Sequence, residues 1–273
     1  MVPVNILDQD IDAVLKRLRR HIIDMAEHSA HVGAALSCVD ILAAVYFEAL
    51  HSPCSPANPK DGDAFVLSKG HGAMALYAVL AEAGLIDTSW LLTYGKDDSL
   101  LAEHPLAGKV PGIEFATGSL GHGLALGAGM ASGFRIQGRR GRVFVLLGDG
   151  ECDEGSVWEA AGAARAQRLD NLIALIDWNN LQACGSRNEI SFGNSLVGCW
   201  QGFGWEVEEI DGHDYRSLAK ALIRPNEKDK PKALLCHTIK GKGVSFMEGD
   251  LEWHYRPVRD DDRERALRLL SDA

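Results

Sequence analysis

Two short apolar runs with a helical pattern between them constrain the fold of this 273-residue chain most. The first run leads into Gly148-Asp149-Gly150, and the second leads into Asn179-Asn180. Two strands joined by a single helix pair in parallel, and open parallel sheets bind ligands at the carboxyl ends of their strands. The pattern therefore predicts that Asp149 and Asn179 lie side by side at one edge of a sheet.

The side chains at this predicted edge suit a hard divalent cation. Asp149 and Asn179 offer oxygen ligands, which Mg²⁺ or Ca²⁺ prefers and zinc does not. Such a cation keeps open positions that phosphate oxygens commonly fill. Gly148 and Gly150 let the backbone approach an anion, and the start of the following helix, expected near residue 153, favours negative charge. The alternative is an ordinary Gly-Asp-Gly turn, but the Asn-Asn pair favours a diphosphate ligand bridged by Mg²⁺.

Composition narrows the class of protein. Apolar residues make up 46% and charged residues 24%, as in soluble globular proteins, and the net charge of −10 argues against general nucleic-acid binding. Residues 120–134, taken as the longest stretch of low polarity, are too few and too rich in glycine to span a membrane. The six cysteines form no Cys-x-x-Cys pair, so we expect free thiols in a reducing cytoplasm and no zinc site. Cys152 is expected to be a solvated loop thiol.

Strand and helix patterns alternate along the chain, which predicts an α/β fold with a mainly parallel sheet covered by helices on both faces. Residues 51–62 and 100–118 read as loops. Residues 1–273 are expected to form a single domain with a C-terminal tail at 257–273, either a short surface helix or frayed. The second helix is expected to begin after Ser37, or at Asp40 as its N-cap residue. Helices are expected at about 8–28, 39–50, 72–83, 119–136, 153–169 and 215–224, and strands at 64–67, 142–147, 172–176, 205–210 and 233–238.

Several motifs in this order resemble the transketolase family, which uses thiamine diphosphate. Gly-Asp-Gly followed by Asn-Asn resembles the general motif for that cofactor, and the other segments resemble transketolases in particular. These segments are Ser68-Lys69-Gly70-His71-Gly72, His104-Pro105, Thr117-Gly118-Ser119-Leu120-Gly121-His122-Gly123, Gly148-Asp149-Gly150-Glu151-Cys152-Asp153-Glu154-Gly155, Asp177-Trp178-Asn179, Lys240-Gly241-Lys242-Gly243 and Trp253-His254. The resemblance covers nearly the whole chain and implies a diphosphate-binding domain of the thiamine-diphosphate fold.

The resemblance implies a cofactor site for thiamine diphosphate and Mg²⁺ (or Ca²⁺). The side chains of Asp149 and Asn179 and the backbone carbonyl of Leu181 would be the metal ligands. The residues implied to contact the cofactor are His71, Gly118, Ser119, Leu120, Gly148, Asp149, Gly150, Glu151, Asn179 and Lys240. A helix-capping turn remains the alternative for residues 118–120.

The resemblance also implies catalytic side chains. His31, His71, His104 and His254 match histidines around the reactive part of the cofactor, where imidazole suits proton transfer to and from hydroxyl groups. Surface or core histidines are the alternative, and it weighs most for His31 and His254, whose flanking residues depart from the family pattern. Tyr255 stands where glycine is common and can narrow the substrate channel.

Two carboxylates and two lysines are further candidate residues of the active site. Glu154 and Glu159 match family carboxylates near the subunit interface, with an exposed helix position as the alternative for Glu159. Lys240 and Lys242 can attract a phosphorylated sugar, or they can be two solvated loop lysines.

The family also needs a carboxylate from a pyrimidine-binding domain, which this sequence lacks. The resemblance therefore implies a split transketolase, in which a separate pyrimidine-binding subunit completes the site. The assembly would contain two copies of each chain and would act on sugars or sugar phosphates. Alternatives are a split enzyme of specialised metabolism, acting on another ketose or forming an acyloin, and a non-catalytic regulatory subunit. A subunit of a decarboxylating dehydrogenase fits less well than a transketolase, because the Asp-Glu-Gly loop and the Lys-Gly-Lys-Gly segment resemble transketolases.

Overall fold

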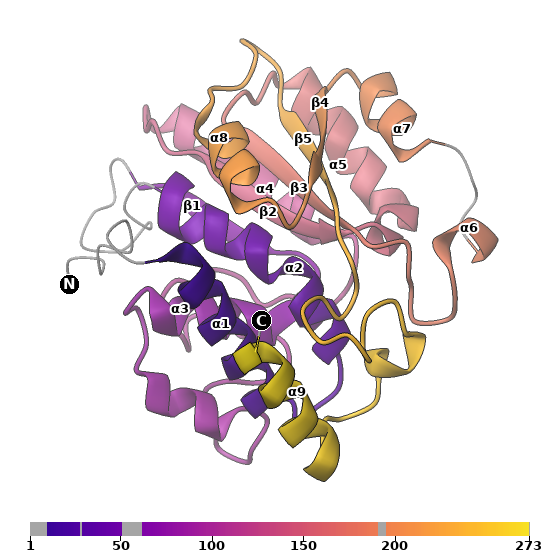
Figure 1. Ribbon diagram of the computed structural model, residues 1–273. Helices are drawn as coiled ribbons and strands as arrows, with labels where there is room; N and C mark the ends of the chain where they lie inside the picture. The colour runs from indigo at the N-terminus through magenta and orange to yellow at the C-terminus, as the bar shows by residue number, and fades with distance from the viewer. Residues whose placement is uncertain (1–9, 28, 51–61, 191–194, 273) are drawn as a thin grey trace.

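The computed structural model describes residues 10–27, 29–50, 62–190 and 195–272, and within them five strands form one parallel sheet in the order β1-β2-β3-β5-β4 (Figure 1). The strands are β1 (Ala64–Leu67), β2 (Val143–Gly148), β3 (Leu172–Trp178), β4 (Glu206–Asp211) and β5 (Lys232–His237). Each lies within two residues of the range expected from the sequence. The predicted parallel pairing of β2 and β3 is confirmed: Gly148 pairs with Asp177, which brings the loops after the two strands together.

Alternate strand residues face two separate hydrophobic cores, and helices cover both. Phe144 and Leu146 of β2 pack beneath α1 (Ile11–Met25), α2 (Val32–Ala44), α3 (Ala73–Glu82), α8 (Tyr215–Ile223) and α9 (Asp260–Asp272). Val143 and Val145 pack beneath α4 (Gly123–Ile136), α5 (Gly155–Ala166) and α7 (Leu196–Gly202). Figure 1 shows the two helix layers on either side of the sheet. The predicted fold class, a mainly parallel sheet with helices on both faces, is confirmed.

Helix α2 starts earlier than the sequence indicated. It begins at Val32, and every residue through Ala44 is buried, so no polar face marks its periodicity. Asp40, expected as an N-cap, lies inside the helix and pairs with Arg19. With the π-helical turn Val45–Ala49, it forms the one described helix long and apolar enough to cross a membrane, yet most of it is buried inside the protein.

The C-terminal tail forms a helix, which is one of the two alternatives expected from the sequence. Helix α9 lies beside α1 (Figure 1), and its Ala266 and Leu270 are buried in the core rather than frayed. Short helices α6 (Arg187–Ile190) and α7, and the turn Thr88–Thr93, were not expected from the sequence. Residues 51–61 of the loop predicted at 51–62, with Cys54 among them, and residues 8, 9 and 28 of the first predicted helix lie outside the described residues.

Helix α4 packs unusually close to the sheet, and this closeness positions one wall of the site. A Cβ atom at Gly123 would lie 2.3 Å from the side chain of Ser68, and one at Gly127 would lie 2.3 Å from Val145 Cγ2. Only glycine fits at both positions. The helix begins at Gly123 rather than at residue 119, because residues 118–122 form a loop at the carboxyl edge of the sheet.

Candidate functional site

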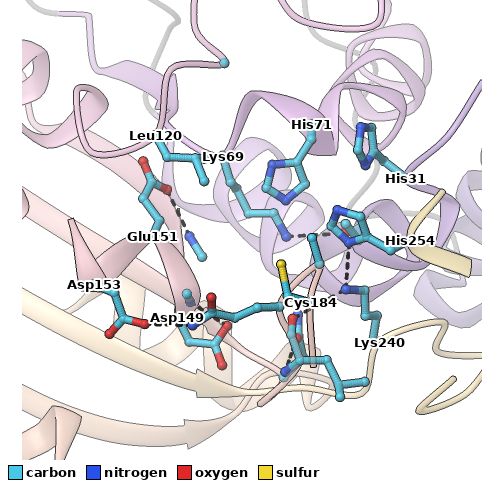
Figure 2. A pocket seen from close by; sticks show the side chains of 18 of the residues that line it. His31, Lys69, His71, Leu120, Asp149, Glu151, Asp153, Cys184, Lys240 and His254 are labelled. Carbon is cyan, nitrogen blue, oxygen red and sulfur yellow. Dashed lines mark hydrogen bonds between the residues drawn. The ribbon is translucent and has the colours of Figure 1, made fainter. Parts of the chain in front are cut away.

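A cavity of about 340 Å³ opens at the carboxyl ends of β1, β2 and β3 (Figure 2). Loops far apart in the sequence contribute to it, as the alternating βα connections of a parallel sheet require. Figure 2 shows His31, His71 and His254 gathered on one side, with Asp149 and Asp153 on the other. The lining also includes Lys69, His104, Gly118, Leu120, Gly148, Gly150, Glu151, Glu154, Asn179, Leu181, Gln182, Cys184, Lys240 and Tyr255.

Asp149 sits where the sequence predicted, at the end of β2 and against the loop that follows β3. Its carboxylate accepts hydrogen bonds from the backbone N–H groups of Gly150 (2.9 Å) and Asn180 (2.8 Å). Burial, reinforced by the nearby Asp177 carboxylate, raises the pKa of Asp149 to about 6. A divalent cation would favour the ionised form of this carboxylate, as expected of a metal ligand.

Asn179 and Leu181 present the other two predicted ligands to the same cavity. The Asn179 amide nitrogen donates to Ser37 Oγ (3.1 Å) and Asp177 Oδ2 (3.3 Å), which fixes which end of the amide carries the oxygen. That oxygen accepts from the N–H of Leu181 at 3.0 Å. The Leu181 carbonyl accepts from Lys240 Nζ at 3.4 Å.

These donors fit a magnesium–diphosphate group. No cluster of three or more His, Cys, Asp or Glu side chains arranged for a metal ion occurs among the described residues. The predicted set is different in kind, with one carboxylate, one amide oxygen and one backbone carbonyl, all of them hard oxygen ligands. A Cβ atom at Gly148 would find no neighbour closer than 4.0 Å, so the backbone there borders open space in the cavity. A phosphate group can approach it closely.

Glu151, expected to contact the cofactor, connects three loops of the cavity through hydrogen bonds. Its buried carboxylate accepts from the N–H groups of Gly121 (2.8 Å) and Gly148 (3.1 Å) and from the Ser68 hydroxyl. These partners belong to the loops before α4, at the end of β2 and after β1. Burial raises the pKa of Glu151, while these bonds favour its ionised form.

The four predicted histidines form one cluster. The ring centroid of His31 lies 4.9 Å from that of His254, 5.4 Å from that of His71 and 6.0 Å from that of His104. Burial and neighbouring positive groups lower the pKa of His31 to about 4, that of His254 to about 3, and that of His71 well below its usual value. These three rings are neutral near pH 7. His31 Nδ1 is buried without a hydrogen-bond partner, as in a site that awaits a ligand.

Lys240 is part of the cavity, whereas Lys242 is not. Lys240 is 2% exposed, and its Nζ lies 2.8 Å from His254 Nδ1. Burial, together with the charge of Lys69, lowers the pKa of Lys240 to about 8. Lys242 lies near the surface, 3.8 Å from Glu248. The alternative of two solvated loop lysines is therefore wrong for Lys240.

Gly118 and Leu120 line the cavity, while two other predicted residues lie outside its lining. Gly118 has φ +139°, and a Cβ there would lie 2.8 Å from His104 Cδ2. Ser119 is exposed beside α4, in a separate surface pocket. Glu154 lies at the rim, and Glu159 is exposed on α5. The expected roles of Ser119 and Glu159 stay predictions.

The sequence did not single out the most deeply buried ion pair of the site. Lys69 donates to Asp177, and the two side chains are 1% and 0% exposed. Both residues lie inside motifs quoted above, so their positions were visible but their pairing was not. Cys152, expected to be solvated, is instead buried beneath the cavity loop, where burial raises its thiol pKa well above the usual value. The exposed thiol on the cavity wall is Cys184.

Comparison with known proteins agrees with this geometry. Residues 8–270 match the family described as transketolase, thiamine diphosphate binding domain. One of the subunits of the apulose-4-phosphate transketolase of Actinobacillus succinogenes is 42% identical over 278 residues, covering all of both chains. The 6-deoxy-6-sulfo-D-fructose transketolase subunit SqwG of a Clostridium species is 41% identical over 242 residues, covering 88% of each chain.

Solved structures show the same relationship. The transketolase of Campylobacter jejuni matches with a TM-score of 0.85 and 30% identity, over 98% of this chain and 43% of that one. The chain thus spans less than half the length of that transketolase, and the matched part has the fold described above. On its sequence, its fold and its full-length relatives, the chain belongs to the transketolase family and matches that family's thiamine diphosphate-binding domain.

Proposed function

We propose that this chain is the diphosphate-binding subunit of a two-subunit transketolase. It would transfer a two-carbon ketol unit from a ketose or ketose phosphate to an aldose or aldose phosphate. A separate pyrimidine-binding subunit would complete the site, in an assembly of two copies of each chain in the cytoplasm. The observation that carries the proposal is the cluster of His31, His71, His104 and His254 in the same cavity as Asp149 and Asn179.

The metal and cofactor would bind at the edge formed by β2 and β3. Asp149, Asn179 and the carbonyl of Leu181 would hold Mg²⁺ or Ca²⁺, and the backbone at Gly148 and Gly150 would lie against the diphosphate. Thiamine diphosphate, when bound, supplies the carbanion that accepts the ketol unit. All further chemistry proposed for this chain consists of orienting the sugar and moving its protons.

The histidine cluster is suited to those proton transfers. Because Lys240 Nζ donates to His254 Nδ1, the proton of neutral His254 is on Nε2. Neutral rings can accept the proton of a donor hydroxyl and return one to the oxygen of the acceptor aldehyde. The lowered pKa values of His31, His71 and His254 keep these rings neutral at physiological pH.

The full-length relatives support a partner and a class of donor. Two of them are named as subunits, one for apulose 4-phosphate and one for 6-deoxy-6-sulfo-D-fructose, and each name specifies a ketose with an anionic group. We therefore propose an anionic ketose of specialised metabolism as the donor. Acyloin formation and a purely regulatory role remain alternatives, but the intact set of Asp149, Asn179 and the histidines argues against a regulatory role.

The proposal is tested by mixing the chain with a pyrimidine-binding subunit sought in the neighbouring gene, in the presence of Mg²⁺ and thiamine diphosphate. A screen of ketose donors and aldose acceptors should show ketol transfer that needs both chains. Absence of transfer from every ketose donor would contradict a transketolase. Calorimetry of the same mixture separates the remaining cases, because a regulatory subunit without a functional site would show no Mg²⁺-dependent cofactor binding.

A further inference from the structure

Lys240 enters the cavity from a tight turn, residues 239–242, that is held at both ends from outside the cavity. The turn closes through the bond from the N–H of Lys242 to the carbonyl of Ile239, at 3.2 Å. At its start, the N–H of Ile239 donates to His213 Nε2 at 2.8 Å. At its end, the carbonyl of Lys242 accepts from Arg19 Nε at 3.3 Å. Lys240 lies between these two anchors.

A single buried carboxylate orients both anchoring side chains. Asp40 on α2 is 1% exposed and accepts from the Arg19 guanidinium at 2.8 and 2.6 Å. It also lies 2.7 Å from His213 Nδ1. Arg19 comes from α1 and His213 from the loop between β4 and α8, so Asp40 joins three elements. None of the three residues is part of the cavity lining.

The hydrogen bonds define the tautomer of His213. A backbone N–H can only donate, so His213 Nε2 must be the acceptor from Ile239. The proton of the neutral ring is therefore on Nδ1, where it is donated to Asp40. Asp40 thus sets the direction in which His213 presents its acceptor to the turn.

The turn also packs directly against α2. The N–H of Gly241 donates to the carbonyl of Gly33 at 3.0 Å, and a Cβ at Gly33 would lie 3.2 Å from Lys240 Cγ. The stem of Lys240 therefore has little space to move while the turn is held. A shift of about 1 Å would break the 2.8 Å contact with His254 Nδ1, because a separation of ~3.6 Å or more is no longer a hydrogen bond.

We propose that Asp40, Arg19 and His213 are positioning residues that hold the Lys240 ammonium against His254 and the Leu181 carbonyl, and that they influence the site through Lys240. The activity readout below rests on the proposed ketol transfer. The competing explanation is that the same three residues only stabilise the fold, joining α1, α2 and the loop before α8. The two explanations differ in whether the effect depends on Lys240.

Two substitutions of His213 separate its two hydrogen bonds. His213→Asn keeps a nitrogen that can donate to Asp40 but has no acceptor at the position of Nε2. His213→Gln places an oxygen near that position and can still accept from Ile239. His21→Asn is the matched control, because His21 also pairs with a carboxylate, Glu82, at 3.1 Å but lies on α1, away from the turn.

In the complex with the partner subunit, His213→Asn should lower kcat/KM about tenfold, as expected for the loss of one buried hydrogen bond. His213→Gln should lose clearly less, and the control should lose none. When Lys240→Met is also present, His213→Asn should cause no further loss, because the residue through which it acts is gone. An equal loss with Lys240 present and absent, or equal losses for the Asn and Gln variants, would overturn the proposal.

Hydrogen exchange supplies a readout that does not depend on activity. The amide of Ile239 should exchange at least tenfold faster in His213→Asn than in His213→Gln, and equal protection would overturn the anchoring itself. If the parent complex transfers no ketol unit, the proposed function fails. The positioning role can still be decided in that case. The hydrogen-exchange data test the anchoring, and the Kd of thiamine diphosphate with Mg²⁺ replaces kcat/KM as the readout for His213→Asn with and without Lys240→Met.

Discussion

Replacing Lys69 with methionine should destabilise the protein strongly. Lys69 and Asp177 are 1% and 0% exposed, and Lys69 Nζ also donates to the carbonyl of Ala34 at 3.2 Å. The substitution leaves the Asp177 carboxylate buried without its counter-ion, and breaking such a pair from one side costs about 3–5 kcal/mol. For a chain of this size the loss corresponds to a decrease in Tm of about 10 °C. Thermal unfolding of the purified chain at pH 7, followed by circular dichroism, measures it.

The double variant Lys69→Met with Asp177→Asn is the control for this reasoning. It removes both charges, so it should be at least as stable as the less stable single variant and should recover much of the lost Tm. Asp177 also accepts hydrogen bonds from the hydroxyls of Ser37 and Thr238. Because the carboxamide of asparagine does not reproduce both bonds to a charged group, complete recovery of the Tm is not expected. A Tm within about 2 °C of the parent for Lys69→Met alone would refute the assignment of a tightly coupled buried pair.

The pair also predicts how this difference depends on pH. Burial alone would raise the pKa of Asp177, but Lys69 and the hydroxyls of Ser37 and Thr238 lower it overall. Its contribution is therefore present above the unfolded pKa of about 3.9 and is lost as the pH falls through the lower folded value. Burial alone would lower the pKa of Lys69, but the Asp177 carboxylate raises this pKa overall. The contribution of Lys69 to stability therefore persists through alkaline pH. The Tm difference between parent and Lys69→Met should persist from neutral pH to about pH 9 and should shrink in acid, where protonation of Asp177 removes the unpaired buried charge of the variant.

Two further predictions concern the walls of the cavity. Gly118→Ala should lower kcat of the assembled enzyme at least tenfold, because φ is +139° and the new methyl group would meet His104 Cδ2 at 2.8 Å; unchanged kcat would contradict this contact. Tyr255→Gly should raise kcat/KM for bulky ketose donors relative to small ones. Tyr255 is 64% exposed and lines the cavity, and its ring centroid lies 4.6 Å from that of His254, so unaltered donor ratios would show that it does not narrow the channel.

The central βαβ unit could be predicted from the sequence because its information is local. Apolar runs of strand length, a helical repeat between them and polar residues after each strand determine where Asp149 and Asn179 meet. The clustering of the four histidines followed from the resemblance rather than from periodicity. In the structure they come from four separate segments, and no local pattern places the His31 ring 4.9 Å from that of His254.

Features that depend on burial or on long-range pairing were missed. Helix α2 has no polar face, so its start at Val32 left no periodic signal. Cys152 looked solvated because it lies in a polar loop, but its side chain is buried in the hydrophobic core beneath α4, α5 and α7. The pairing of Asp40 with His213 joins residues 173 positions apart, and no sequence spacing reveals it. Charged residues of this kind are buried only when paired, and the pairing is a property of the fold.

The proposed function requires that the edge formed by Asp149 and Asn179 hold a metal-bridged diphosphate. Titration calorimetry of thiamine diphosphate into the complex of both subunits tests it, with and without Mg²⁺, for the parent and for Asp149→Asn. We expect one cofactor per copy of this chain, binding that requires Mg²⁺, and binding at least a hundredfold weaker in the variant. Binding of equal strength without a divalent cation, or in Asp149→Asn, would contradict it.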